Sequence, residues 1–392
     1  MDFAQFIAPF DASRFRAEYY GSRSVHIRGD SRERRDLLPW SRFNEVLSLA
    51  PCWNEETLKV YYRSRAALRE NYCDVADLKP GALAPVNPAK VKALLGLGAS
   101  LVANQLHRVC PAVGAVARML AAEFAARSYA NVYCSFRDVQ AFQTHFDLHD
   151  VFAVQVEGEK TWRVYESRAD APVAPVPPGD EGEKFLIATR GAVLFEVVMK
   201  PGDVLYLPRG QYHDALTGAQ ASLHVTFGLS PATGLSLFKL LEKVLTAESA
   251  FRAYLPDARE PAALRARLAA LGSRVAQAMT SPAFVIDVLN AQRELVGGGE
   301  ADYGLPAQVP PAWYSLAKSA RVVRREGGYA VAFEGGEIAI GATHPTIAWM
   351  LSQRLFALDD ALARQNGVDS RELRADLEML LRAGVIVATE MR

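Results

Sequence analysis

Two histidines and one aspartate have the types and spacing of a metal site. His145 and Asp147 lie in the segment QTHFDLHDVF, and His213 lies in YLPRGQYHDA. Side chains at positions i and i+2 of a strand share one face, so a strand here would direct His145 and Asp147 to the same side. Two neutral imidazoles and one carboxylate form the facial ligand set that holds Fe(II) and leaves coordination positions open. The pattern therefore predicts an iron centre, and its residual positive charge favours an anionic cosubstrate.

Other histidines compete for these roles. The chain has seven histidines, and an isolated histidine is more often a packed or surface residue than a ligand. His149 continues the alternation from His145 and is an alternative ligand, although we assign it to the surroundings of the metal. His224 alternates with Ser222 and Thr226 along one strand face, which would let it line a pocket. Packing inside a barrel would explain His149 and His224 equally well.

Short segments rich in Val, Phe and Tyr follow one another between residues 131 and 229, and Gly or Pro turn signals separate several of them. The expected strands are NVYCSF (131–136), VFAVQVEG (151–158), KTWRVY (160–165), AVLFEVVM (192–199), DVLYLP (203–208) and SLHVTFGL (222–229). Such a series predicts a sandwich or jelly roll, the architecture of the cupins. Helical periodicity precedes it at 113–129, and the Pro-rich acidic segment at 170–183 is expected to be an exposed loop.

The rest of the chain suggests an α+β protein with further parts. We expect a catalytic barrel with N-terminal helices over 1–230 and a helical region over 231–300, with a Gly- and Pro-rich linker at 297–311. Residues 308–392 contain a Gly-Gly hairpin, three short helical stretches and a final strand, which is typical of a winged-helix domain.

Composition narrows the classes of function. Lys plus Arg and Asp plus Glu both total 44, and the C-terminal part is also neutral, whereas a nucleic-acid binder usually carries a basic surplus. The N-terminus has no apolar signal core, and no apolar run is long enough to span a membrane. The four cysteines have no Cys-x-x-Cys spacing, so free thiols in the cytosol are expected.

These motifs together resemble the JmjC-domain ribosomal oxygenases, which are cupin-fold protein hydroxylases. The similar segments are NVYCSF, THFDLHDVFAVQVEGEKTWRVY, KPGDVLYLPRGQYH and SLHVTFGL, together with YYGSRSVHIRG (19–29) near the N-terminus. The resemblance implies a double-stranded β-helix, followed by a helical dimerisation region at 234–298 and a winged-helix domain. It also implies a dioxygenase that uses Fe(II), 2-oxoglutarate and O2.

The resemblance assigns roles to single residues. His145, Asp147 and His213 would bind Fe(II). Lys160 lies where the family places the basic residue that pairs with the distal carboxylate of 2-oxoglutarate. A cation there makes physical sense, because an unpaired buried carboxylate is costly. Further positions that line the cosubstrate pocket in the family correspond to Asn131, Tyr133 and Ser222, and Arg209 would contact substrate or the neighbouring loop.

The expected reaction is hydroxylation of a side chain in a ribosomal protein or a ribosomally made peptide. The chain departs from the family pattern at Thr144, where Pro is common. A lysine at position 160 resembles the pattern of the family branch that acts on histidine, whereas the bacterial branch that acts on arginine carries Arg at this position. A non-catalytic cupin that binds a metal or ligand is one alternative. A ligand-sensing transcription regulator with a DNA-binding winged helix is another, although the neutral C-terminal charge disfavours a nucleic-acid partner.

Overall fold

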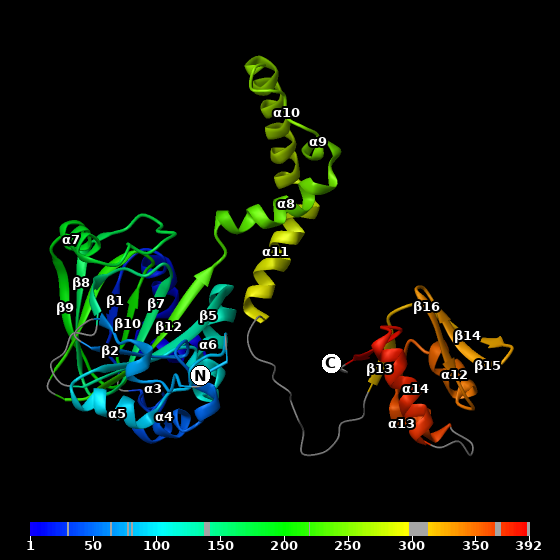
Figure 1. Cartoon of the computed structure of the whole chain (residues 1–392), viewed down its shortest axis with the longest axis horizontal. Helices are drawn as coiled ribbons and strands as arrows, with labels where there is room; N and C mark the ends of the chain where they lie inside the picture. The colour runs from blue at the N-terminus through cyan, green and yellow to red at the C-terminus, as the bar shows by residue number, and fades with distance from the viewer. Residues whose placement is uncertain are drawn as a thin grey trace. The chain divides into compact units, whose positions relative to one another are not determined.

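A computed structural model describes residues 1–29, 31–62, 65–76, 78–79, 81–136, 142–218, 220–297, 313–364 and 370–389. The chain divides into two compact units, Met1–Glu300 and Ala301–Arg392 (Figure 1). The linker expected at 297–311 lies almost entirely outside the described residues. No described helix is long and apolar enough to cross a membrane.

Two antiparallel sheets form the centre of the first unit (Figure 1). In the described chain the larger sheet has the order β1 (Val25–Ile27), β10 (Val204–Leu207), β7 (Asp150–Glu157), β12 (Ser222–Pro231), β5 (Ala126–Ser135), β4 (Ser100–Ala103), β2 (Leu58–Tyr62) and β3 (Arg65–Ala66). The smaller sheet has the order β6 (Phe142–His145), β11 (Gln211–Thr217), β8 (Lys160–Arg168) and β9 (Val193–Met199). Each strand expected between 131 and 229 is present, within a few residues of its predicted ends.

Strand β7 is apolar on both of its faces over its first half. Val151 and Ala153 belong to the small apolar cluster between the two sheets, which also contains Trp162. The intervening residues Phe152 and Val154 belong instead to the large cluster on the outer face of the larger sheet. Successive side chains of a strand point to opposite faces, so the segment from Val151 to Val154, which is covered on both sides, is apolar at every position.

Helices near the N-terminus cover that outer face. They are α1 (Phe3–Ile7), α2 (Ala12–Arg14), α3 (Arg32–Arg35), α4 (Trp40–Leu47), α5 (Pro88–Gly96) and α6 (Pro111–Phe124). The ring of Phe6 lies 5.8 Å from Phe152 and 6.2 Å from Phe227. All three rings are buried, and burial of a Phe side chain contributes about 2 kcal/mol to stability. These contacts pack helix α1 against the outer face of the larger sheet.

Two local expectations were wrong. The helix predicted over 113–129 ends at Phe124, and residues from Ala126 onward belong to β5. Ala125 adopts a left-handed backbone conformation with φ of 47°, which stops the helix and turns the chain into the sheet. The loop predicted over 170–183 ends earlier, because α7 (Asp180–Thr189) begins with Asp180, Glu181 and Glu183 in its first turn. Acidic residues favour a helix N-terminus through the helix dipole.

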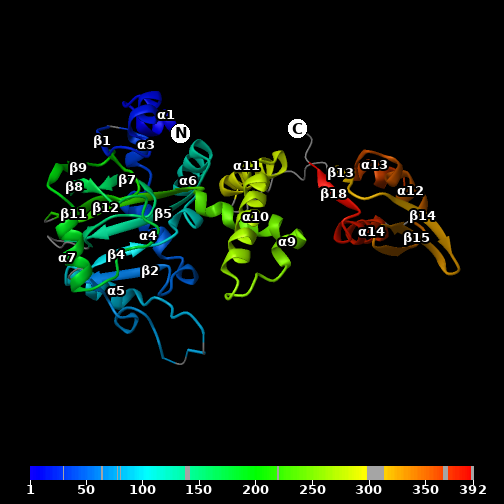
Figure 2. The ribbon, with the colours of Figure 1, turned by 90° about the horizontal axis from the view of Figure 1, so that it is seen from above.

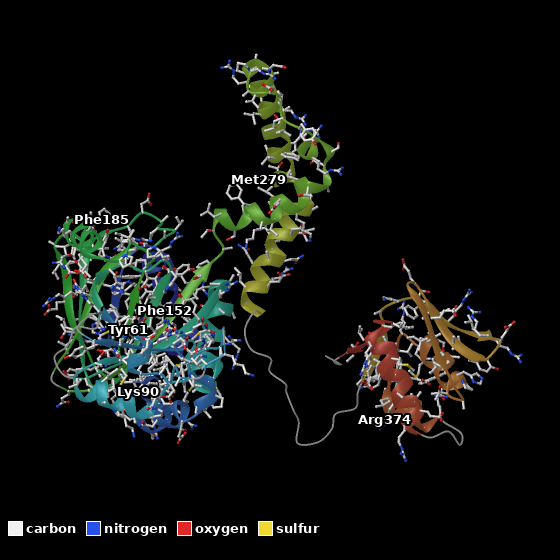
Figure 3. The ribbon with its side chains drawn as sticks, in the orientation of Figure 1. Tyr61, Lys90, Phe152, Phe185, Met279 and Arg374 are labelled. Carbon is white, nitrogen blue, oxygen red and sulfur yellow. The ribbon has the colours of Figure 1, made fainter. Side chains whose placement is uncertain are left out.

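Helices α8 (Leu237–Ala247), α9 (Ser249–Arg252), α10 (Pro261–Thr280) and α11 (Pro282–Gly297) follow the barrel, as the periodicity predicted. Helix α11 contacts α6 and β5. Many large apolar side chains of these helices remain exposed, among them Phe238, Met279, Ile286 and Leu289. Met279 is labelled in Figure 3. The helices therefore carry more apolar surface than their own packing covers.

The second unit contains two three-stranded sheets and three helices (Figure 2) among its described residues. The sheets have the orders β17 (Leu355–Ala357), β13 (Trp313–Leu316), β18 (Ile386–Thr389) and β14 (Ala320–Arg325), β15 (Gly328–Phe333), β16 (Gly336–Ile340). The helices are α12 (His344–Ser352), α13 (Leu358–Ala363) and α14 (Ser370–Arg382). The predicted hairpin and helical stretches are present, and the structure adds β13, β14 and β17.

Candidate metal centre

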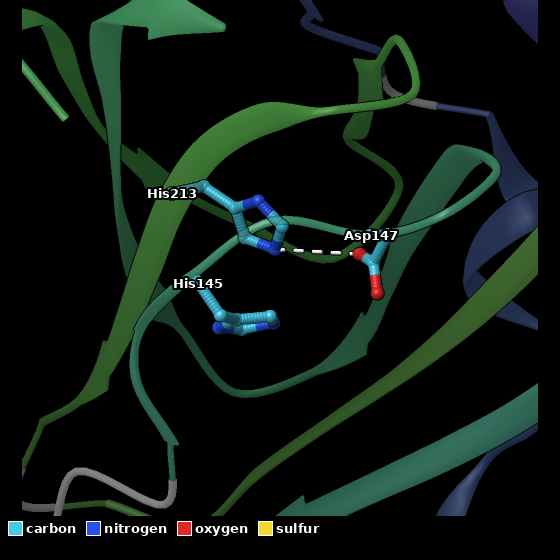
Figure 4. Close-up of side chains that lie close together, drawn as sticks. All are labelled: His145, Asp147 and His213. Atoms are coloured by element: carbon cyan, nitrogen blue, oxygen red, sulfur yellow. Dashed lines mark ion pairs between the residues drawn. The ribbon is translucent and has the colours of Figure 1, made fainter. Parts of the chain in front are cut away.

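The three predicted ligands converge at one end of the smaller sheet. Strand β11 pairs with β6 so that His213 is directly opposite His145. The possible ligand atoms of His145, Asp147 and His213 all lie within 4.8 Å of one another. Nε2 of His213 lies 3.6 Å from Oδ2 of Asp147 (Figure 4). Three donors at this spacing can share one metal ion.

Asp147 reaches the site in a way that the strand argument did not foresee. Strand β6 ends at His145, so Asp147 lies in the turn that leads to β7 and not on a strand. Its carbonyl oxygen accepts a hydrogen bond of 2.9 Å from the backbone N–H of Gly210, in the turn before β11. This bond ties the turn that carries the aspartate to the turn that precedes β11, the strand of His213.

Backbone hydrogen bonds set the tautomers of both histidines. Nδ1 of His145 donates to the carbonyl of Gln143 at 2.8 Å, and Nδ1 of His213 donates to the carbonyl of Gln211 at 2.9 Å. A proton on Nδ1 leaves the lone pair of each neutral ring on Nε2. Such backbone contacts orient metal-ligating histidines and make them better donors.

The electrostatics keep the site in a metal-binding protonation state. Burial lowers the pKa of His213 to about 4, and the neighbouring His145 acts in the same direction. Burial alone would raise the pKa of Asp147, but His213, His145 and His149 outweigh it and lower that pKa. Near neutral pH this gives a neutral His213 beside an ionised Asp147. Neutral imidazoles with one carboxylate fit the ligand set that Fe(II) prefers.

A cavity of about 280 Å³ extends from the triad between the two sheets. Lys160 lies in its wall, and its side chain is only 3% exposed. No described residue forms an ion pair or a hydrogen bond with its ammonium group. Burial lowers the pKa of Lys160 to about 8, and Cys134 offsets this only in part. A buried cation without a partner is costly, so this position suits an anionic ligand.

The ring of His224 also borders the cavity. It stacks on Tyr133 with the ring centroids 4.9 Å apart and meets the edge of Trp162 at 5.4 Å. Nδ1 of His224 and Nε1 of Trp162 are both buried and have no hydrogen-bond partner among the described residues. These two atoms and the Lys160 ammonium group make this part of the cavity suited to a polar ligand.

Of the other residues predicted to line the cosubstrate pocket or contact substrate, some line the cavity and others lie outside it. Asn131 and Tyr133 line the cavity, and so does His149, which is outside the group of three possible metal ligands. Ser222 does not line it, because its hydroxyl accepts a hydrogen bond of 2.8 Å from Nε2 of Gln155. Arg209 borders a separate cleft, where its guanidinium donates to backbone carbonyls at 171 and 172.

A buried polar network behind the histidines was missed by the sequence argument. Thr144 donates to Asp214 at 2.9 Å and accepts from Arg190 at 2.6 Å. The Tyr165 hydroxyl donates to the same oxygen of Asp214 at 2.6 Å. Thr144 and Asp214 each adjoin a predicted ligand in sequence, so the network fixes β6 against β11 where the metal would bind. The Thr144 departure from the family pattern was the signal that could have revealed it.

Residues 108–237 match the model of the JmjC domain. This segment of the chain is similar to the JmjC-domain family. The match covers the triad, Lys160 and strands β5–β12, and it supports the predicted JmjC and cupin fold with mixed α and β content.

Similar proteins include the bifunctional lysine-specific demethylase and histidyl-hydroxylase NO66 of Drosophila willistoni, which is 32% identical over 184 residues, 44% of this chain and 23% of that protein. The protein of the same name from Dictyostelium discoideum is 38% identical over 119 residues, 30% of this chain and 23% of its own length. The chain therefore spans less than a quarter of the length of these relatives. The ribosomal oxygenase YcfD from Escherichia coli, in complex with cobalt and 2-oxoglutarate, aligns over 97% of this chain and 99% of its own, with 17% identity and a TM-score of 0.48.

Proposed function

We propose that this JmjC protein is an Fe(II)- and 2-oxoglutarate-dependent dioxygenase that hydroxylates a side chain of a protein or peptide. One observation carries the proposal: the same cavity holds three converging candidate metal ligands and a buried lysine that no described residue pairs with. A metal-binding triad alone would suit many cupins. The added cation meets the requirement of a dicarboxylate that is bound to the metal at one end.

Each part of the cavity has a task in this reaction. His145, Asp147 and His213 would hold the iron by three bonds and leave positions open for the 2-oxo acid group and O2. Lys160 would pair with the distal carboxylate of 2-oxoglutarate. When bound, iron and 2-oxoglutarate supply the oxidising chemistry, which converts O2, 2-oxoglutarate and a C–H bond into succinate, CO2 and C–OH.

The aromatic wall of the cavity would exclude water and orient the cosubstrate. Trp162, Tyr133 and His224 pack ring against ring. The unpartnered Nε1–H of Trp162 can donate to a carboxylate, and His224 can donate or accept through Nδ1. In this dry setting an ion pair between Lys160 and a carboxylate is stronger than in water.

The relatives support a polypeptide substrate, because two of them are named as histidyl-hydroxylases and lysine-specific demethylases. Hydroxylation of an N-methyl carbon also begins demethylation, so both outcomes belong to the same chemistry. A ribosomal protein or a ribosomally made peptide remains our preferred substrate. We assign the protein to the cytosol, which agrees with its four free cysteines.

We further propose that α8–α11 form a homodimer interface. A second copy of the chain is the occupant that best explains their exposed apolar side chains. For the second unit we propose a winged-helix fold built from α12–α14 with β13, β17 and β18. Its neutral charge suits a protein-interaction or substrate-orienting role better than DNA binding.

The test is anaerobic loading with Fe(II), followed by addition of 2-oxoglutarate, O2 and a cellular protein and peptide extract. Succinate formation and a gain of one oxygen in a polypeptide are expected for the wild type. Asp147→Ala should produce neither, whereas the exposed Asp170→Ala should behave as wild type. Metal binding without any 2-oxoglutarate consumption would favour the non-catalytic cupin.

A further inference from the structure

A second, open cleft of about 640 Å³ lies beside the metal cavity. We call it the arginine cleft, because Arg108, Arg118 and Arg127 line it. Tyr129 and Asn131 line both the arginine cleft and the metal cavity. The two spaces therefore share a wall, and the cleft offers a neighbouring surface to a chain that reaches into the cavity.

The shared wall is one face of β5. Arg127, Tyr129, Asn131 and Tyr133 alternate along this strand, so their side chains point to the same side. The first of them lines the cleft, the next two line both spaces, and the last lines the cavity. With a rise of about 3.3 Å per residue, Arg127 lies roughly 13 Å along the strand from Asn131. Strand β5 thus forms a track from the cleft to the metal.

The charge of the arginine cleft is positive. Glu56 is the one acidic residue among the described residues that line it, against three arginines. Arg108 donates to the neutral side-chain oxygen of Gln105 at 3.0 Å, and no described carboxylate pairs with it. Arg127 likewise forms no ion pair with a described residue. Two exposed guanidinium groups are therefore available to an anion.

The ligand chemistry that fits best is a carboxylate side chain. A guanidinium group binds a carboxylate through two parallel hydrogen bonds, which adds geometric selectivity. Single-stranded nucleic acid would require a series of aromatic side chains for base stacking. Among the described residues that line the cleft, Tyr129 is the single Phe, Tyr or Trp, and Leu295 and Val296 add an apolar wall. Such a mixed surface suits a polypeptide.

We propose that the arginine cleft selects the substrate sequence by binding an Asp or Glu side chain on one side of the hydroxylated residue. This inference rests on the proposed function, because it assumes that a polypeptide side chain enters the metal cavity. An extended chain advances about 3.3–3.6 Å per residue. The acidic side chain should therefore lie about three to five residues from the hydroxylated one.

Binding of short fluorescent oligomers to the full-length, metal-loaded protein tests the chemistry of the cleft. Oligo-glutamate should bind at least about tenfold more tightly than oligo-lysine or oligo-uridylate, because charge-assisted pairs dominate. Arg108→Gln with Arg127→Gln should weaken oligo-glutamate binding by about tenfold or more. The matched control is Arg32→Gln with Arg42→Gln, which removes the same charge from exposed positions outside the cleft.

Three results would overturn the proposal. Oligo-glutamate could bind the wild type no better than oligo-lysine does, or it could bind both double variants equally. Alternatively, oligo-uridylate could be the tighter ligand and the one that the cleft variant loses, which would make the cleft a nucleic-acid site. Thermal unfolding of each variant at the wild-type temperature confirms that a loss of binding is local.

A peptide series tests the spacing. Each peptide has a central His or Arg and a single Glu that is moved one position at a time, and hydroxylation is read as a gain of one oxygen. The yield should peak with Glu about three to five residues from the centre. Arg127→Glu should shift the preference to Lys at the same position. A flat profile overturns the spacing, whereas a wild type that never consumes 2-oxoglutarate removes the proposed function and leaves the oligomer result standing.

Discussion

The ring of His213 lies 4.4 Å from the ring of His145, because β11 and β6 pair in register at these two residues. The two residues are 68 positions apart in the sequence. The pairing of these two strands therefore brings the two histidine rings together near Asp147. We therefore expect metal affinity to fall when a ligand, or a residue that positions a ligand, is replaced.

Redox-stable Mn(II) should stabilise the wild type against unfolding. At a metal concentration near one hundred times Kd, linkage gives about 2.7 kcal/mol. Asp147→Ala should lose this gain, because it removes the carboxylate from the ligand set, and Asp170→Ala should retain it. Thermal unfolding with Mn(II) or a chelator provides the measurement. An undiminished gain in Asp147→Ala would place the metal elsewhere.

Replacing Lys160 with Met should make the folded protein more stable and should weaken the binding of 2-oxoglutarate. Burial lowers the pKa of Lys160 from 10.5 to about 8. The unfolded chain binds the proton more tightly, so below pH 8 the buried charge costs roughly 3 kcal/mol, at about 1.4 kcal/mol per pKa unit. Lys160→Met removes that cost.

Denaturant unfolding at pH 7 measures the gain, and titration calorimetry measures 2-oxoglutarate affinity. The affinity should fall by about tenfold to one hundredfold, the usual loss for a hydrogen bond to a charged group. The control Lys200→Met changes an exposed lysine and should shift stability by less than about 0.5 kcal/mol. A Lys160→Met protein that is less stable than the wild type would contradict the assigned cost.

Affinity for 2-oxoglutarate should depend on pH through the same ammonium group. In the cosubstrate-free protein the pKa of Lys160 is about 8, so the charged form prevails below that pH and is lost above it. The apparent Kd should therefore rise above pH 8, approaching about tenfold per pH unit.

Lys160→Arg provides the matched comparison, because a guanidinium stays charged throughout this range. Its affinity should be nearly constant between pH 7 and pH 9 if the Arg side chain fits the cavity. Calorimetric titrations of the metal-loaded proteins across that range would show the difference. Parallel pH profiles for the two proteins would mean that another group controls binding.

The polar network of Thr144, Asp214 and Arg190 should affect metal affinity by holding the ligating histidines in position. Thr144→Val removes the hydroxyl between Arg190 and Asp214, and leaves the buried carboxylate with fewer partners. Stability should fall by about 1–3 kcal/mol, and metal affinity should fall by about tenfold or more, as for other supporting contacts. Thr144→Ser should restore both, since it retains the hydroxyl. Loss of stability with unchanged Mn(II) affinity would limit Thr144 to a structural role.

The proposed dimer should depend on the exposed apolar residues of α8 and α11. Phe238→Glu with Ile286→Glu should halve the molar mass measured by light scattering, because buried carboxylates would oppose association. Phe185→Glu with Ile187→Glu is the control, since these residues are also exposed but lie on α7. A wild-type monomer, or a dimer that only the α7 variant disrupts, would place the interface elsewhere or remove it.

Residue types and their spacing were sufficient to predict a metal-dependent chemistry for this protein. The segments around His145, Asp147 and His213 predicted the ligand set, and alternating apolar residues predicted the barrel strands. These features are local, so the sequence is enough to predict them. The end of α6 could not be predicted in this way, because Ala126–Tyr129 contain no helix-breaking residue. Their inclusion in β5 depends on pairing with β12.

Tertiary structure decided what the local pattern left open. It placed Asp147 in a turn and Ser222 against Gln155, and it gave Lys160 no ion-pair partner among the described residues. It also connected Thr144 to Asp214, and it placed Arg127 on the face of β5 that leads to the candidate metal site. Each of these relationships links residues through strand pairing or a shared cavity. Burial and the loss of water around a charge arise only when distant segments meet, so sequence spacing carries no direct record of them.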